Sequence, residues 1–267
     1  MSEHYYDKEA NPQFKAGVVR ARKENYLPSV TTVMKIIDKP GLNQWKQKQV
    51  LLAAANNPKN ENESDREYEN RILDESRDKS SSAANFGTDI HKAIEKFLNN
   101  GDLPSSQKVY SSFQSLNKKM DLISLNGKTE DTLVSKDYGF AGTVDWHGNY
   151  GGYAIIDWKT QDVKWKEYKK PTDDPYEIKK GDIYLRPNPV FYDEWPMQLW
   201  ACGYMVTENY NHFIDKYISV VINSDPEHPE VIYIKEYDID TILWAQKAFL
   251  TCLDLWRLIK KFPYKTL

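Results

Sequence analysis

Three ionisable residues lie close together in the stretch GTVDWHGNYGGYAIIDWKTQD, residues 142–162. Two apolar runs flank a centre rich in glycine and asparagine, and this pattern predicts a β-hairpin that reverses about residues 149–151. Asp145 interrupts the first run, and Asp157 and Lys159 close the second. Side chains alternate along a strand, so Asp157 and Lys159 share one face, and the reversal brings Asp145 close to Asp157. The hairpin is therefore expected to gather two carboxylates and an ammonium group at one end.

A cation is the simplest chemical reason for such a cluster. Two neighbouring carboxylates repel each other and raise each other's pKa unless positive charge lies between them. Lys159 supplies part of that charge, and a divalent metal ion supplies more, because carboxylate oxygens are the ligands that Mg²⁺ and Mn²⁺ prefer. An exposed ion pair at a strand end fits the same spacing, since Asp-x-Lys is a common tripeptide. On spacing alone, the metal site and the surface ion pair both stay open.

The elements that must position these side chains change character along the chain. Residues 1–27 are expected to form a solvated N-terminal arm. Helical patterns cover residues 28–121, and strand patterns interspersed with helices cover the core, residues 129–267. The sequence therefore predicts one α/β domain over residues 28–267, with a central mixed sheet flanked by helices and a helical N-terminal portion.

An irregular insert loop is expected over residues 161–194, between the hairpin and the next helix. Its sequence KWKEYKKPTDDPYEIKKGDIYLR mixes lysines with aromatic residues, and such a loop could clamp single-stranded DNA by charge and stacking. Acidic residues also run through it, so a solvated loop fits the composition equally well.

Four further residues could contribute to a site from other elements. His91 lies at the edge of an apolar stripe in the predicted helix SAANFGTDIHKAIEKFLNNG, where a histidine is more often structural than a ligand. Gln198 and Tyr204 lie on the apolar helix WPMQLWACGYMVTEN, where packing explains them almost as well as function. Glu130 comes just before the first strong strand pattern.

Composition narrows the classes of protein. A net charge of -3 argues against binding to nucleic acid through bulk positive charge, although a local basic channel stays open. The sequence has no signal-peptide pattern and no apolar stretch of bilayer length, so we expect a cytoplasmic protein without a membrane partner. The segment Asn126–Thr129 resembles the end of a phosphate-binding loop but lacks that loop's first glycine, where Leu122 stands. We therefore expect no nucleotide cofactor.

Four motifs in chain order resemble those of the PD-(D/E)XK nuclease superfamily, and within it the RecB-like and phage exonuclease branch. They are GTDIHKAIEKF (87–97), YGFAGTVDW (138–146), IIDWKT (155–160) and MQLWACGYM (197–205). The segment PSVTTVMKIIDKPGLNQW (28–45) is also similar to the N-terminal helices of phage-type members. Each motif alone is weak, whereas four in the right order on the right types of element form a specific signal.

This resemblance implies a restriction-endonuclease-like core and gives each site residue a role. His91, Asp145 and Asp157 would bind Mg²⁺ or Mn²⁺, and Lys159 would position or deprotonate the attacking water. Gln198 would contact the substrate or brace the lysine, and Glu130 would be an additional carboxylate near the site.

The sequence departs from the family pattern at one position. The usual tyrosine lies four residues after the glutamine, where this chain has Cys202, and Tyr204 lies six residues after it. A substrate-binding role for Tyr204 is therefore an open prediction. Some relatives carry an iron–sulfur cluster on four cysteines; this chain has only two, so no iron–sulfur cluster is expected.

The function that the resemblance implies is a metal-dependent exonuclease. It would act on the ends of linear DNA during DNA processing or recombination, in the host cytoplasm if a phage encodes it. A non-catalytic DNA-binding or assembly module of the same fold, and an endonuclease, are the alternatives. The sequence leaves cleavage polarity, strand preference, processivity and oligomeric state open, including the rings that processive members of the superfamily form around DNA.

Overall fold

The computed structural model describes residues 4–263, apart from the side chains of 78–80, 82 and 83. Packing divides the chain into two units. The core unit comprises Met1–Ile36 and Ile90–Leu267, and the helical unit comprises Ile37–Asp89. Compact packing does not show which segments fold independently, so the predicted domain boundaries at 1–27 and 28–267 stay a prediction.

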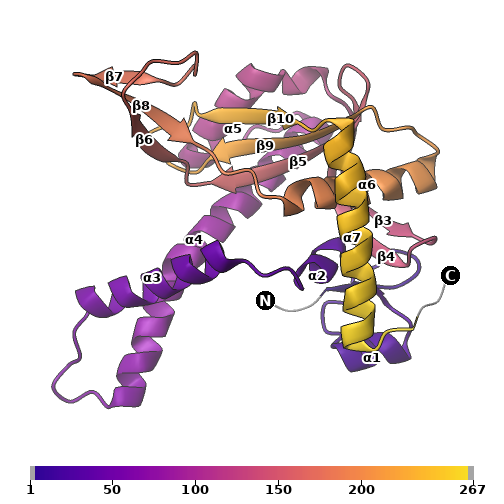
Figure 1. Ribbon diagram of the computed structural model, residues 1–267, viewed down its shortest axis with the longest axis horizontal. Helices are drawn as coiled ribbons and strands as arrows, with labels where there is room; N and C mark the ends of the chain where they lie inside the picture. The colour runs from indigo at the N-terminus through magenta and orange to yellow at the C-terminus, as the bar shows by residue number, and fades with distance from the viewer. Residues whose placement is uncertain (1–3, 264–267) are drawn as a thin grey trace. The chain divides into compact units, whose positions relative to one another are not determined.

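A five-stranded mixed sheet forms the centre of the core unit (Figure 1). Its strands are β3 (Asn126–Ser135), β4 (Phe140–Asn149), β5 (Tyr153–Gln161), β9 (Lys216–Asn223) and β10 (Ile232–Glu236). The spatial order is β10-β9-β5-β4-β3, in which β5 and β9 run parallel and the other neighbours run antiparallel. The predicted hairpin is β4–β5, with Trp146 opposite Ile156.

Helices flank this sheet. They are α5 (Gln107–Met120), α6 (Glu194–Tyr210) and α7 (Ile239–Lys260), and a short 3-10 helix (Leu122–Ser124) leads from α5 into β3. Helix α6 packs against β3, β4, β5 and β9, α7 packs against α6, and α5 packs against β9 and β10. The predicted central mixed sheet flanked by helices, with a helical N-terminal portion, is confirmed.

The helical unit contains α3 (Pro40–Asn56) and the first two-thirds of α4 (Asp65–Asn100), whose last turns lie in the core unit. A capping box starts α4: Ser64 Oγ accepts from the Glu67 backbone N–H, and the Glu67 carboxylate accepts from the Ser64 backbone N–H. Among the described residues, no helix combines the length and the apolar character needed to cross a bilayer.

The N-terminal arm is packed, so the expectation of a solvated tail over 1–27 is wrong for the described residues 4–27. Strand β1 (Tyr5–Tyr6) pairs with β2 (Leu27–Pro28), and α1 (Val18–Lys23) lies between them in sequence. Tyr5 is only 1% exposed and stacks on Phe262. Burial of a few apolar side chains therefore outweighs the polar composition of the arm. Helix α2 (Val30–Met34) follows, and the Ser29 side chain caps its N-terminus.

The insert at 161–194 is also more regular than expected. It contains a three-stranded antiparallel sheet of β6 (Lys164–Tyr168), β7 (Ile178–Lys180) and β8 (Ile183–Asn188), in the order β6-β8-β7. In Figure 1 this sheet extends from the β5–β9–β10 end of the central sheet. Trp165 of β6 packs on a buried cluster of the core, and this burial turns a charged, alternating sequence into a strand.

Candidate metal centre

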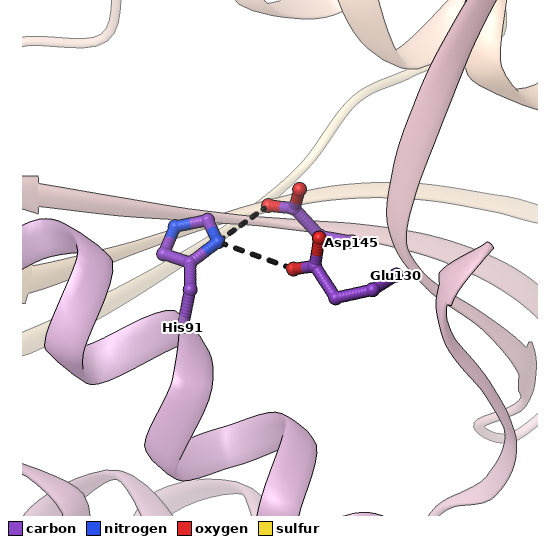
Figure 2. Close-up of side chains that lie close together, drawn as sticks. All are labelled: His91, Glu130 and Asp145. Atoms are coloured by element: carbon purple, nitrogen blue, oxygen red, sulfur yellow. Dashed lines mark ion pairs between the residues drawn. The ribbon is translucent and has the colours of Figure 1, made fainter. Parts of the chain in front are cut away.

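Three side chains from three elements converge in the core unit (Figure 2). They are His91 of α4, Glu130 of β3 and Asp145 of β4. His91 Nδ1 lies 3.6 Å from Asp145 Oδ2 and 3.7 Å from Glu130 Oε1. One ligand atom of each residue lies within 4.8 Å of the other two, and all three residues are half-buried. One imidazole and two carboxylates at this separation could hold a divalent metal ion.

The orientation of His91 is set by a backbone carbonyl. His91 Nε2 lies 2.9 Å from the Trp158 carbonyl oxygen, which can only accept a hydrogen bond. Nε2 therefore carries a proton and donates it, and Nδ1 faces Glu130 and Asp145, where it could bind a metal ion once it has lost its own proton. Metal-binding histidines are commonly held in this way by a hydrogen bond on the far nitrogen.

Glu130 reaches the centre from an unusual backbone conformation. Its φ is 48°, in the left-handed region that glycine favours, although it lies inside a strand. Within the described strands, the β3–β4 ladder pairs Thr129 with Trp146 and Asp131 with Val144, and it skips Glu130 and Asp145 between them. Left-handed conformations of residues other than glycine cost about 1–3 kcal/mol and cluster at functional sites. The strained residue, Glu130, is therefore one carboxylate of the candidate centre, and the other, Asp145, lies at the same interruption of the ladder.

The neighbouring acid, Asp131, is engaged elsewhere. Its Oδ2 accepts from the Tyr210 hydroxyl at 2.7 Å and lies 2.9 Å from Nε2 of the buried His147. His147 Nδ1 lies 2.9 Å from the Tyr153 hydroxyl. Of the two adjacent acids in β3, Glu130 faces the candidate centre and Asp131 belongs to a separate polar network.

Asp157, Lys159 and Gln198 form a hydrogen-bonded group beside the three residues. Asp157 Oδ1 accepts from Lys159 Nζ at 2.9 Å and from Gln198 Nε2 at 3.1 Å. Lys159 Nζ also donates to Gln198 Oε1 at 2.9 Å. The amide of Gln198 thus bridges the lysine and the aspartate, which is the bracing geometry that the sequence suggested as one of two roles.

The second carboxylate oxygen of Asp157, Oδ2, is buried close to Lys159. The residue is 5% exposed, and among the described residues no donor makes a well-directed hydrogen bond to its Oδ2, although Lys159 Nζ lies 2.7 Å away. This oxygen is therefore in an ion pair with the lysine. The imidazole of His91 and the carboxylates of Glu130 and Asp145 form the donor set that fits a divalent metal ion, and Asp157 adds a further carboxylate close to Lys159.

The two groups of residues are electrostatically coupled. The Trp158 N–H donates to Asp145 Oδ2 at 3.0 Å, and the same residue's carbonyl accepts from His91. Burial, and then the charge of Asp157, raise the pKa of Asp145 to about 7. Burial lowers the pKa of His91, but the nearby Glu130 carboxylate and the charges of Asp145 and Asp157 outweigh burial and raise that pKa to about 9.

Lys159 keeps its proton in these surroundings. Burial acts to lower its pKa, but the charges of Asp157 and Asp145 outweigh burial and raise it. The carboxylates, the imidazole and the ammonium therefore form one cluster in which each group changes the charge of its neighbours.

Tyr204 contacts the turn between β3 and β4. Its hydroxyl donates to Asp137 Oδ2 at 2.8 Å, and its ring lies 4.8 Å from that of Tyr138 in the β3–β4 turn. Residues four apart share a helix face, so the residue of α6 on the face of Gln198 is Cys202. Cys202 is buried, and burial followed by the charges of Asp157 and Asp145 raises the pKa of its thiol. Substrate contact by Tyr204 stays a prediction.

Two residues of the candidate metal centre and its surroundings, Glu130 and Trp158, are weakly indicated or not indicated by the sequence motifs. Glu130 is indicated by the sequence only as an additional carboxylate just before the first strand pattern, because nothing in that pattern shows the left-handed backbone of this residue. The backbone of Trp158 binds both His91 and Asp145, and no side-chain motif could reveal that role.

Comparisons with known proteins give little beyond this geometry. No family model matches the chain, and no curated protein matches its sequence. Among solved structures, it is similar to a crystal structure named "Putative exonuclease" from Eubacterium rectale. The two share 12% sequence identity with a TM-score of 0.42, over 66% of this chain and 68% of that chain. A likeness of this degree carries no argument about activity, so the roles below rest on the residues of this chain.

Proposed function

We propose that this protein hydrolyses phosphodiester bonds of DNA with the help of a divalent metal ion. The observation that carries the proposal is the convergence of His91, Glu130 and Asp145, next to a buried Asp157 and a Lys159 that is braced by Gln198. A mere surface ion pair would need neither the strained Glu130 backbone nor the burial of Asp157.

The ion would be held by His91, Glu130, Asp145 and Asp157. When bound, Mg²⁺ or Mn²⁺ polarises a scissile phosphate and lowers the pKa of a water. The Trp158 carbonyl keeps the His91 ring in place, and the Trp158 N–H holds the Asp145 carboxylate. Preorganised ligands of this kind avoid reorganisation when the substrate arrives.

Lys159 would act on the attacking water and on the phosphate. Its ammonium is fixed by Asp157 and Gln198. In the proposed mechanism this positive charge would stabilise the negative charge that develops on the phosphoryl oxygens. As an ammonium Lys159 would position the water, and to accept the water's proton it would first have to release one of its own. Attack on phosphorus breaks the bond to the 3′ oxygen, which takes up a proton, and leaves a 5′-phosphate and a 3′-hydroxyl.

An exonuclease that acts on linear DNA ends is the form of this activity that we propose, with DNA processing or recombination as its setting. This finer assignment rests on the resemblance of the four sequence motifs. An endonuclease and a non-catalytic DNA-binding module are the alternatives, and they differ from the exonuclease in the substrates that they cleave.

The test is a cleavage assay on end-labelled linear DNA and on closed circular DNA. With Mg²⁺ or Mn²⁺ the protein should degrade the linear DNA and spare the circle, and EDTA should stop the reaction. Lys159→Ala should lower turnover by at least about 100-fold while the variant stays folded, because loss of one preorganised donor to a transition state typically costs that much. The matched control is Lys118→Ala, an exposed lysine of α5, which should cleave as the wild type does.

Three results would contradict the proposal in distinct ways. Robust cleavage by Lys159→Ala would rule out the mechanism. Cleavage of the circle would indicate an endonuclease. DNA binding without any metal-dependent cleavage would indicate the non-catalytic module.

A further inference from the structure

A pocket of about 510 Å³ lies between the segment that starts α6, the first turns of α7 and the end of β10. Its volume falls in the range of roughly 300–1,000 Å³ that is usual for ligand sites. Aromatic rings contribute to every wall, and they belong to Phe191, Tyr192, Tyr237 and Trp244. None of these residues takes part in the candidate metal centre.

Two of the rings are partly exposed to solvent. Tyr192 is 47% exposed and comes just before α6, and Trp244 is 46% exposed and lies on α7. The pocket thus has one exposed ring from each of two walls. Exposed aromatic faces of this kind are surfaces on which nucleic-acid bases stack, because every base has an apolar π-face.

The pocket is connected to the candidate catalytic lysine through one aromatic ring. Lys159 Nζ lies 5.8 Å from the ring centre of Trp195, and the Trp195 ring lies 5.4 Å from that of Tyr192. A second connection runs through the Tyr237 hydroxyl, which donates to Ser219 Oγ at 3.4 Å. Ser219 is the ladder partner of Asp157. A DNA strand whose scissile phosphate lies at the metal centre would therefore pass close to this pocket.

The charged groups of the pocket favour a base over a phosphate. Lys235 Nζ lies over the rings of Phe191 and Tyr237, at 5.0 and 4.9 Å. Asp193 and Asp240 add two carboxylates. One ammonium and two carboxylates make the pocket net negative, which opposes phosphate. The amino groups of cytosine, adenine and guanine each offer two N–H donors to carboxylates, whereas an unpaired thymine has no amino group and offers only its N3–H.

From these observations we propose that the pocket binds an unpaired base of the strand being cleaved. The substrate class is then DNA with a single-stranded or frayed end, and bases that carry an amino group are preferred over thymine. This inference rests on the proposed nuclease function and adds the form of DNA that the same site accepts.

Binding of tailed DNA hairpins in EDTA tests the inference without hydrolysis. Fluorescence anisotropy compares a blunt hairpin with hairpins that carry a short dC or dT tail. The wild type should bind the dC tail more tightly than the blunt end, and the dC tail several-fold more tightly than the dT tail. Trp244→Ala and Tyr192→Ala should each lose about tenfold on the dC tail, as expected for loss of one stacked base, and nothing on the blunt hairpin.

The matched control is Phe213→Ala, which removes another exposed ring, 80% exposed and outside the pocket. It should bind all three hairpins as the wild type does. Circular dichroism confirms folding of each variant, and Lys235→Gln offers a milder change to the same pocket that should also weaken binding of the dC tail.

The outcomes separate this inference from the proposed function. If Trp244→Ala and Tyr192→Ala bind the dC tail like the wild type, the pocket is not a base site, and metal-dependent cleavage of linear DNA by the same variants leaves the nuclease proposal intact. Equal binding of dC and dT tails by the wild type overturns the role of the carboxylates. If the wild type neither binds nor cleaves DNA, both proposals fail.

Discussion

Glu130 contributes a carboxylate to the candidate metal centre from a backbone conformation that costs free energy. Its φ of 48° is tolerated without penalty by glycine, whereas a residue with a Cβ is strained there. The strain persists in a strand whose neighbours pair normally on both sides. We interpret it as the consequence of turning this side chain toward His91 and Asp145.

Replacement of Glu130 should therefore separate stability from metal binding. In EDTA, Glu130→Gly should raise the free energy of unfolding by up to about 1 kcal/mol relative to Glu130→Gln, since glycine relieves the strain and glutamine keeps it. Both variants should bind Mn²⁺ more weakly than the wild type, because both lack the carboxylate. Urea unfolding and calorimetric titration measure the two effects. A glycine variant less stable than the glutamine variant would show that the backbone is not strained.

At the residue scale, motif spacing predicted the polar residues but not how they group. Asp157, Lys159 and Gln198 contact one another as a set, and His91 and Asp145 approach each other, as the resemblance of the sequence motifs implied. Spacing could not show that the Glu130 carboxylate lies 3.7 Å from His91 Nδ1, because its position depends on the backbone dihedral angle φ of Glu130. The metal-binding and catalytic roles of these residues stay predictions.

At the scale of elements, the β3–β4 ladder is what brings Glu130 and Asp145 together. Its far end depends on two facing glycines, Gly127 and Gly148, which are ladder partners. A Cβ added to Gly127 would lie 2.2 Å from the His147 carbonyl oxygen and 2.8 Å from Gly148 Cα. Gly127 belongs to the segment that resembles the end of a phosphate-binding loop, and the close approach of two backbones explains it without a phosphate.

Gly127→Ala should consequently destabilise the fold. The added methyl group meets backbone atoms, which cannot rotate away, so the free energy of unfolding should fall by about 1–3 kcal/mol or more. Gly17→Ala is the control, because a Cβ there has no neighbour within 4 Å, and its effect should stay within about 0.5 kcal/mol. Chemical denaturation of both variants gives the comparison, and equal stability of the two would contradict the close packing of the strands.

Elements with a clear hydrophobic periodicity could be predicted from the sequence, whereas elements stabilised by residues distant in the sequence could not. The apolar residues of α7 recur at helical spacing in the sequence, and they include the buried Phe249 and Trp256. The strands of the insert were missed because charge obscured an alternation that only burial of Trp165 makes decisive. The packed arm was missed because Tyr5 is buried by residues at the other end of the chain, Trp256 and Phe262.

At the scale of the whole molecule, all the proposed ligands and the aromatic pocket belong to the core unit. The acids of the candidate centre repel one another in the absence of a counter-ion, so an ion that binds only the folded state should stabilise the core. The gain is expected to be about 2.7 kcal/mol when the free ion is at 100 times its dissociation constant.

Calorimetric titration with Mn²⁺ tests the central claim most directly. The wild type should bind Mn²⁺, and Asp145→Asn should weaken binding by at least about tenfold, because loss of a carboxylate ligand affects the ion more than loss of an outer-shell partner, which itself costs about 10–100-fold. Asp162→Asn, which removes an exposed acid, should bind as the wild type does. Equal Mn²⁺ affinity in the wild type and Asp145→Asn would contradict the metal centre and the mechanism built on it.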